Sequence, residues 1–189
     1  MRSDAQENYH HLLATARAVV AEEGASASMR DIARKAGVGP ATLFRHFPTR
    51  EALLDTLLRS SLEELTQKAD ALASTSADDS ADNSADDALV AWLRDAVAFV
   101  RTYSGAVTMM AAALSDPASA LHASCESLRS AGARLLARAQ AEGSADKNMT
   151  GGDMFALIGA LGWMGDQDSF AARSDYLFDV IARSILNRV

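Results

Sequence analysis

The chain has 189 residues, of which 49% are hydrophobic and 23% are charged, and its formal net charge is −7. This composition predicts a folded chain of one or two domains and excludes a wholly disordered one. Cys125 is the only cysteine, which excludes an internal disulfide, and no apolar stretch has the length of a membrane span. The first residues contain no apolar signal region, so we expect a soluble cytoplasmic protein.

Residues 4–23 show the spacing of an amphipathic helix. Apolar side chains recur every three or four residues and would form one stripe along it. Gly24 follows at a place where helices commonly end in a left-handed residue. We expect this helix to pack across the shorter helices that come next, through Tyr9, Leu12, Leu13, Ala16, Val19 and Val20.

Residues 28–36 predict a short helix. Ser28 precedes an apolar-periodic stretch and has Asp31 three places on, which predicts a capped helix that starts near Met29. Gly37 stands where a helix end favours a residue without a Cβ atom, because only such a residue becomes left-handed without strain. The chain is therefore expected to turn there.

A second short helix is predicted over residues 40–47. Pro40 suits its first turn, where the missing N–H costs nothing, and Pro48 ends it. Leu43 and Phe47 lie four residues apart and would pack inward, which leaves other side chains of this helix facing outward. Two short helices joined by a glycine-containing turn form a helix-turn-helix, which makes DNA the first partner to consider.

The charge of the chain is unevenly distributed. Residues 1–50 contain seven Lys and Arg against five Asp and Glu, whereas residues 51–189 contain eleven against twenty. The first part is therefore +2 and the rest −9. An acidic bulk would repel DNA everywhere except at the intended face.

The remaining chain is also predicted to be helical. A helix begins after Thr49 and continues to about residue 72, with a broad apolar face. Residues 74–87, STSADDSADNSADD, are small, polar and acidic, so we expect a mobile loop. No period-two alternation is long enough for a sheet, so the predicted fold class is all-α. Further helices are expected at about 87–103, 105–115, 118–142, 151–165 and 169–187.

The helix-turn-helix block resembles the DNA-binding domain of TetR-family transcriptional regulators. The resemblance rests on the Ala33 and Gly37 spacing, the LFRHF run and the PTREALL run, and it covers residues 8–58. It implies a helix-turn-helix DNA-binding domain over residues 1–50, followed by a helical ligand-binding and dimerisation domain over residues 51–189.

The resemblance implies that the second short helix is a recognition helix in the major groove of DNA. Pro40, Ala41 and Thr42 would then face base edges, and Arg30 would reach a base or a phosphate. Carried over position by position, the expected DNA-binding set is Ser28, Met29, Arg30, Pro40, Ala41, Thr42, Phe44, Arg45, His46 and Arg50.

Within this set, His46 and Arg50 match phosphate contacts, and Arg50 lies at the positive end of the helix that Thr49 caps. Phe44 departs from the family pattern, because many relatives carry a tyrosine there and use its hydroxyl on a phosphate. Phe44 lacks this hydroxyl, so we expect it to keep only a packing or sugar contact. Arg45 is left open between DNA and solvent.

For the C-terminal part, the resemblance implies a pocket for a small effector and a homodimer interface built from the last two helices. Gly159, Gly162 and Gly165 would permit close approach there, although ordinary monomer core is the alternative reading. The scarcity of charged residues at apolar positions favours a mainly apolar or aromatic effector. Aromatic and methionine residues at helical spacing more often belong to a protein core than to a ligand site. With that alternative, the candidate pocket residues are Trp92, Phe99, Tyr103, Met110, Cys125, Leu128 and Trp163.

The expected function is that of a dimeric repressor, without a cofactor or enzymatic activity, that a small molecule releases from a palindromic operator. The alternatives are a metal-dependent enzyme and a helical interaction module, neither of which binds DNA. His122, Cys125 and Glu126 would share one helix face, enough for three metal ligands, but a cysteine at an apolar position is far more often a buried small hydrophobe. No nucleophile elbow, phosphate loop or zincin motif occurs, so we expect no catalytic or metal site.

Overall fold

The computed structural model describes residues 2–24, 27–74, 84–103, 106–165 and 167–186. Within these ranges every regular element is a helix, so the predicted all-α fold class is confirmed. The chain divides into two compact units, one comprising Met1–Ser60 with Thr102–Gly105, the other Ser61–Arg101 with Ala106–Val189. None of the described helices is both long and apolar enough to cross a membrane.

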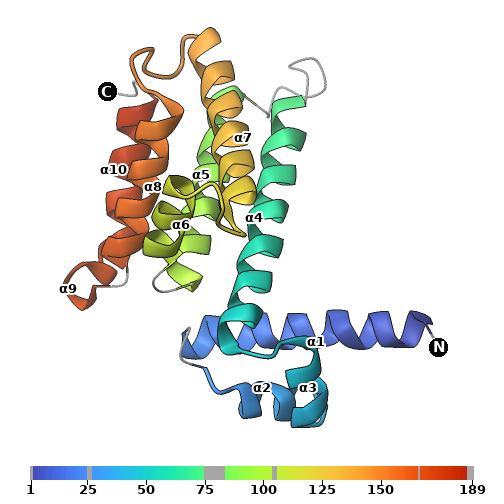
Figure 1. Cartoon of the computed structure of the whole chain (residues 1–189). Coiled ribbons are helices and arrows are strands. Elements are labelled where there is room, and N and C mark those ends of the chain that lie inside the picture. The colour runs from blue at the N-terminus through green and yellow to red at the C-terminus, as the bar shows by residue number, and fades with distance from the viewer. Residues whose placement is uncertain (1, 25–26, 75–83, 104–105, 166, 187–189) are drawn as a thin grey trace. The chain divides into compact units, whose positions relative to one another are not determined.

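The first unit contains α1 (Arg2–Glu23), α2 (Met29–Lys35), α3 (Pro40–His46) and the beginning of α4 (Arg50–Ser74). α1 lies across the pair formed by α2 and α3 (Figure 1). A continuous apolar core joins these helices, because each presents its small and branched side chains inward. Its fully buried members include Leu12, Ala16, Val19, Val20, Ile32, Ala33, Leu43, Leu53 and Leu57.

The turn between α2 and α3 has a glycine-based helix end. Gly37 has a φ of 66° and follows the C-cap residue Ala36. Its N–H donates to the Arg34 carbonyl at 3.1 Å, while the Val38 N–H donates to the Ala33 carbonyl at 3.0 Å. These two hydrogen bonds form a Schellman motif, which satisfies carbonyls that the end of α2 would otherwise leave unpaired.

Side-chain hydroxyl groups cap the N-terminal ends of α2 and α4. The Ser28 hydroxyl accepts a hydrogen bond from the Asp31 N–H at 3.4 Å, as expected for a capped helix. The Asp31 carboxylate pairs with Arg34, one turn further along α2, at 3.1 Å. At the start of α4, the Thr49 hydroxyl accepts from the Ala52 N–H at 3.1 Å.

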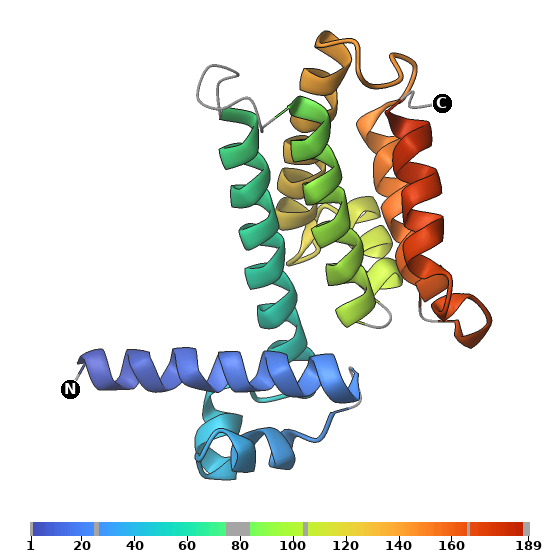
Figure 2. The same cartoon turned by 180° about the vertical axis from the view of Figure 1, so that it is seen from behind.

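The second unit contains the remainder of α4 with α5 (Ala85–Thr102), α6 (Ala106–Ser115), α7 (His122–Ala141), α8 (Gly151–Gly165), α9 (Asp168–Ala171) and α10 (Ser174–Ile185). α5 lies between the C-terminal half of α4 and α10 (Figure 2). The indole N–H of Trp92 on α5 donates to the Leu65 carbonyl on α4 at 3.0 Å. On the other side, the Arg94 guanidinium lies 4.3 Å from the centre of the Phe178 ring on α10.

Two glycines of this unit mark places where helices approach closely. A Cβ atom at Gly162 on α8 would lie 2.1 Å from Val100 Cγ1 on α5. A Cβ atom at Gly132 on α7 would lie 2.5 Å from the Trp92 ring. Both glycines therefore serve packing inside one subunit, and Gly162, expected at the dimer interface, instead makes room for α5.

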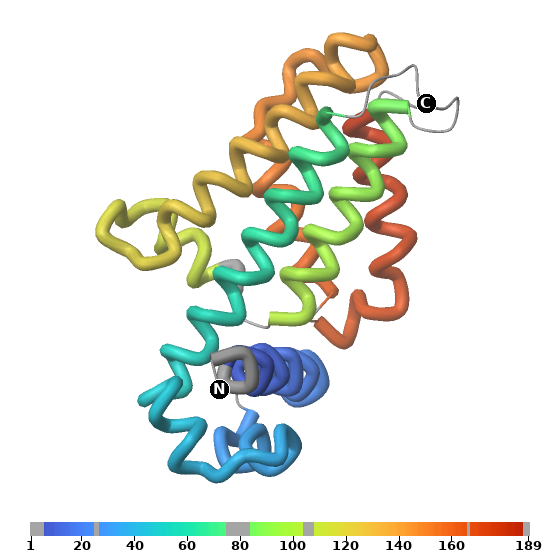
Figure 3. Tube along the Cα trace, turned by 90° about the vertical axis from the view of Figure 1, so that its right-hand side faces the viewer, coloured from blue at the N-terminus to red at the C-terminus, as the bar shows by residue number. Residues whose placement is uncertain are grey.

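Three predicted element bounds are wrong. α7 begins at His122 and not at residue 118, because Asp116 Oδ1 accepts the Ala118 N–H at 2.9 Å and the Ser119 hydroxyl accepts the Leu121 N–H at 3.3 Å. Such side-chain bonds form turns in place of helix. Figure 3 shows this turn in yellow, between α6 and α7.

The helix predicted over residues 169–187 is divided. A turn at residues 172–173 separates α9 from α10, so the last helix begins at Ser174. The predicted loop 74–87 is also too long at its end: the Ser84 hydroxyl accepts the Asp87 N–H at 3.3 Å, and residues 85–87 already form the first turn of α5. Residues 75–83 of that loop lie outside the described residues.

Candidate nucleic-acid interface and effector cavity

α3 separates its side chains into an anchored face and an outward face. Leu43 is fully buried in the first unit, and Phe47, the residue that ends the helix, is 3% exposed. The other side chains of α3 are exposed, except that Thr42 is half-buried. The expected DNA-facing residues of α3 that lie on this exposed side are Pro40, Ala41, Phe44, Arg45 and His46.

An aromatic cluster supports the end of α3. The Tyr9 ring on α1 lies 5.9 Å from the Phe47 ring and 5.5 Å from the His46 ring, measured between centroids. His46 is exposed, yet its ring is held against Tyr9. The sequence pattern assigned Tyr9 only to the packing stripe of α1 and did not indicate this second role.

The basic residues around the helix-turn-helix differ in whether an acidic group of the protein holds them. Lys35 pairs with Glu23 at 3.1 Å and with Glu22 at 3.5 Å, and the hydrogen bond to Glu23 raises the pKa of Lys35. Arg34 pairs with Asp31, as described above. In the part of the chain that the structure describes, no acidic group pairs with the remaining cations of this region, which are Arg30, Arg45 and Arg50.

Those three arginines are all exposed and lie near helix ends. Arg30 is the second residue of α2, Arg45 lies in the last turn of α3, and Arg50 is the first residue of α4. Exposed guanidinium groups without an internal carboxylate partner are available to phosphate oxygens.

Two expected DNA-facing residues are engaged inside the protein. Met29 is 8% exposed, so its side chain belongs to the core, because it sits at the first position of α2 where the helix meets α1. The Ser28 hydroxyl already accepts the Asp31 N–H as the N-cap of α2. Only their main-chain groups, or a second bond from the Ser28 hydroxyl, remain for a partner.

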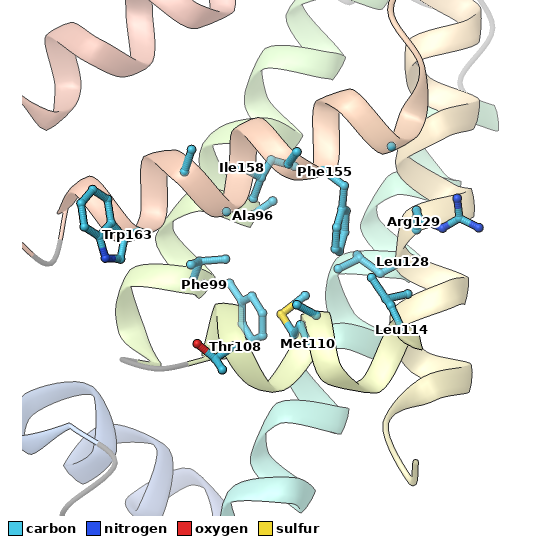
Figure 4. Close-up of a pocket in the computed structure, with 16 residues that line it drawn as sticks. Ala96, Phe99, Thr108, Met110, Leu114, Leu128, Arg129, Phe155, Ile158 and Trp163 are labelled. Atoms are coloured by element: carbon cyan, nitrogen blue, oxygen red, sulfur yellow. The ribbon is translucent and has the colours of Figure 1, made fainter. Parts of the chain in front are cut away.

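The second unit contains a partly open cavity of about 490 Å³ between α5, α6, α7 and α8 (Figure 4). The lining is mostly aliphatic and aromatic, from Phe99 and Val100 on α5 to Phe155 and Ile158 on α8. A volume of this size falls in the range of small-molecule sites, which are predominantly apolar with a few polar groups. Its other lining residues are Ala96, Thr108, Met110, Ala111, Leu114, Leu128, Arg129, Gly152, Ala156, Gly159, Ala160 and Trp163.

The structure distributes the seven expected pocket residues between this cavity and the core. Phe99, Met110, Leu128 and Trp163 line the cavity. Trp92, Tyr103 and Cys125 do not. The first is completely buried beside Gly132, Tyr103 is 4% exposed, and Cys125 is completely buried on α7.

Burial raises the pKa of the Cys125 thiol to about 11, and the neighbouring Glu126 carboxylate contributes to the same effect. Cys125 is completely buried and acts as a small apolar side chain of the core. His122 Nδ1 lies 2.8 Å from the Ala113 carbonyl, and Glu126 pairs with Arg129. Among the described residues no three His, Cys, Asp or Glu side chains come together to hold a metal ion.

Two family models match the chain. The model described as "Bacterial regulatory proteins, tetR family" matches residues 12–57, which contain the helix-turn-helix. The model described as "Transcriptional regulator SbtR-like, C-terminal domain" matches residues 84–185, more than half of the chain. The chain belongs to the TetR family of transcriptional regulators.

Solved TetR-family structures extend the match over almost the whole chain. A TetR transcriptional regulator from Streptomyces coelicolor is 28% identical, with a TM-score of 0.70 over 94% of this chain and 97% of its own. A TetR regulatory protein from Mycobacterium vanbaalenii is 26% identical, with a TM-score of 0.61 over 98% of each chain. The regulator FadR from Bacillus subtilis, solved in complex with stearoyl-CoA, shares the fold at 16% identity, with a TM-score of 0.54 over 94% of this chain and 99% of its own.

This TetR-family regulator therefore binds DNA through a helix-turn-helix, and α2 and α3 form it. Its second unit carries the residues matched by the family's C-terminal model. On the last helices of that unit, large apolar side chains are exposed: Trp163 by 55%, Tyr176 by 53% and Val180 by 42%. The opposite side of α10 is buried through Phe178, Ala182 and Ile185.

Proposed function

We propose that this TetR-family regulator is a dimeric cytoplasmic repressor, released from a palindromic operator when an apolar small molecule occupies the cavity of its second unit. The observation that carries this proposal is the cavity of about 490 Å³ between α5, α6, α7 and α8. A closely packed interior rarely leaves such a space without a ligand for it.

The proposed DNA face consists of α3 and the arginines around it. Thr42 and its neighbours Pro40 and Ala41 would read base edges, because they lie in the first turn of the recognition helix. Arg30 and Arg50 would bind phosphates, with His46 held in place by Tyr9. Phe44, which is 42% exposed, would contact the sugar-phosphate backbone without a hydrogen bond.

The proposed dimer interface is formed by α8 and α10. The exposed side chains of Tyr176 and Val180 on α10 support it, because a partner would remove their apolar surface from water. A two-fold dimer would also double the number of base contacts, since one short recognition helix reads only a few base pairs.

The proposed link between ligand and DNA is α4, which contributes residues to both units. In the second unit, Trp92 on α5 donates to the Leu65 carbonyl, and Arg138 on α7 donates to the Leu72 carbonyl at 2.8 Å. Asp70 also pairs with Arg134 on α7. A ligand that moves α5 or α7 would therefore act on α4 directly, and a typical coupling of about 1–3 kcal/mol would change DNA affinity about 5- to 150-fold.

The occupant of the cavity is proposed to be mainly apolar. FadR from Bacillus subtilis, which has the same fold, was solved with stearoyl-CoA, so a long apolar chain is compatible with this architecture. The lining residues of the present cavity agree with that chemistry, because almost all of them are aliphatic or aromatic.

The test begins with selection of bound fragments from the genome that encodes the protein. We expect one or a few palindromic sites, and a dimer that neutralises about six phosphates should lose roughly a thousandfold in affinity between 50 and 200 mM salt. Apolar metabolites are then screened for release of these fragments. Weak binding that shows no salt dependence would instead identify a helical interaction module that does not use DNA.

A further inference from the structure

Arg129 on α7 is the only charged side chain among the described residues that line the cavity. It lies at one end, beyond Leu128 and Phe155, with its guanidinium directed outward from these two residues, while Trp163 lies at the other end (Figure 4). Between them, Thr108 is the polar side chain among the described lining residues. The cavity is thus apolar along its length with one cation at an end.

The present partner of Arg129 is Glu126, one turn earlier on α7. Arg129 Nε donates to Glu126 Oε1 at 3.2 Å, and Nη2 donates to Oε2 at 2.7 Å. Both side chains are substantially exposed, at 44% for Arg129 and 36% for Glu126. An ion pair this exposed contributes little to stability, so another carboxylate can replace Glu126 at small cost.

The N-terminal end of α8 lies at the same end of the cavity as Arg129. Gly152, the second residue of α8, lines the same cavity as Arg129. Gly151 packs against Ala133, one turn beyond Arg129, where an added Cβ atom would lie 2.7 Å from the Ala133 Cβ atom. The absence of both side chains lets the first turn of α8 approach the helix that carries Arg129, and the Asp153 carboxylate of that turn accepts the Thr150 N–H.

We infer that the ligand of this cavity is an apolar molecule with one carboxylate, which replaces Glu126 on the guanidinium of Arg129. That this ligand acts as an effector rests on the proposed function, whereas its binding to the cavity does not. A planar guanidinium matches a carboxylate through two parallel hydrogen bonds, whereas a phosphate dianion would leave a second charge without a cation. The apolar remainder of the molecule then extends towards Trp163.

Three probes with the same hydrocarbon chain and different ends test the inference: decanoate, 1-decanol and decylamine. Their binding to the full-length protein is measured by calorimetry without DNA. We expect decanoate to bind roughly tenfold more tightly than decanol, because its end forms charge-assisted hydrogen bonds, and decylamine to bind most weakly.

Variants assign the preference to a residue. Arg129→Gln should bind decanoate and decanol equally. The matched control is Arg134→Gln, which removes an exposed arginine of the same helix that pairs with Asp70 and does not line the cavity, and it should keep the preference. Glu126→Gln should bind decanoate more tightly than the unsubstituted protein, because it removes the competing carboxylate.

The inference is overturned if decanoate binds no more tightly than decanol, if the preference survives in Arg129→Gln, or if none of the three probes binds. A separate measurement of operator release distinguishes the two proposals. Decanoate that binds through Arg129 without releasing DNA contradicts the proposed function and leaves this inference standing. Operator release by decanol and decanoate at equal affinity would contradict this inference and would support the proposed function.

Discussion

On α3 and its neighbours, single residues have environments that suit different contacts with DNA. Thr42 is half-buried in the first turn of the recognition helix, so its hydroxyl and methyl groups are held in a defined position. Arg50 is exposed at the first position of α4, where the flexible side chain is free to follow a phosphate. A positioned short side chain suits base recognition, and a mobile cation suits the backbone.

We therefore expect Arg50→Ala to weaken binding to all DNA sequences by a similar factor. It should also reduce the slope of log affinity against log salt by about one for each phosphate that the protein no longer neutralises. Thr42→Ala should change the preferred base at one position of each half-site, at about 1–3 kcal/mol. Binding to a library of operator variants at several salt concentrations measures both effects. A uniform loss from both substitutions would show that Thr42 does not read bases.

Sequence reasoning reached the residues of the cavity only in part. Helical spacing predicts which residues are buried, and Trp92 and Cys125 are indeed completely buried. It does not predict whether a buried side chain meets another side chain or an open space, because that depends on how neighbouring helices pack. Arg129 carried no signal at all, since an arginine three residues after a glutamate is typical of an ordinary solvated helix face.

The helices themselves were more predictable than their ends. The range predicted for α8 agrees with Gly151–Gly165, where apolar periodicity starts after a polar segment that caps it. Thr150 donates its hydroxyl and its N–H to the Asp153 carboxylate at 2.7 and 2.9 Å, and these bonds lower the pKa of Asp153. The predicted start of α7 was wrong because hydrogen bonds from side chains to the backbone near residues 116–121 compete with helix formation.

The buried face of α4 is wider at its first turns than one apolar stripe. Leu53 and Leu57 are each 1% exposed and Leu58 is 2% exposed, whereas Leu54 is half-buried. A run of adjacent leucines satisfies two helical registers, so periodicity alone does not choose between them. Packing against α1 and its neighbours decides the register.

The close approach of α8 to α5 gives a prediction at the scale of helices. Gly162→Ala should lower the free energy of unfolding by about 1–3 kcal/mol, because its Cβ atom would lie 2.1 Å from Val100 Cγ1. The control is Gly152→Ala, where the nearest atom is Thr150 Oγ1 at 3.5 Å. That substitution should be neutral or stabilising by up to about 1 kcal/mol.

Urea unfolding measures both variants. Adding Val100→Ala to Gly162→Ala should recover part of the loss, since it removes the atom that the new Cβ meets. Equal stability of Gly162→Ala and the unsubstituted protein would mean that α5 and α8 separate at little cost.

At the scale of the whole molecule, the charge distribution concerns contact with DNA, and the exposed apolar residues concern contact with a second copy of the chain. An acidic bulk would repel DNA outside the helix-turn-helix, whereas the exposed apolar side chains of α10 would favour contact with a second copy of the chain. The charge division could be predicted directly from residue counts. The partner surface was harder to predict, because the apolar residues of α10 serve both its own core and the outer face.

Val180→Lys tests the proposed dimer, because it places a charge on the exposed face of α10 without disturbing the buried one. We expect the protein to become monomeric at micromolar concentration and operator affinity to fall by about tenfold or more, since two linked recognition helices bind far better than one. Analytical ultracentrifugation and operator titration are the measurements.

The matched control is Met109→Lys on α6, where an exposed apolar residue of similar exposure, 39% against 42%, also becomes charged. It should leave the dimer intact. Dimers that persist in Val180→Lys with unchanged operator affinity would exclude α10 from the interface.

The two tryptophans of the chain have unequal surroundings. Trp92 is completely buried with its indole N–H bound to a carbonyl, whereas Trp163 is 55% exposed at one end of the cavity. Acrylamide should therefore quench the fluorescence of Trp163 and spare that of Trp92. With phenylalanine at one or the other position, a single unlabelled sample reports ligand occupancy through Trp163 or folding of the second unit through Trp92. The protein thus contains separate optical probes for the two properties.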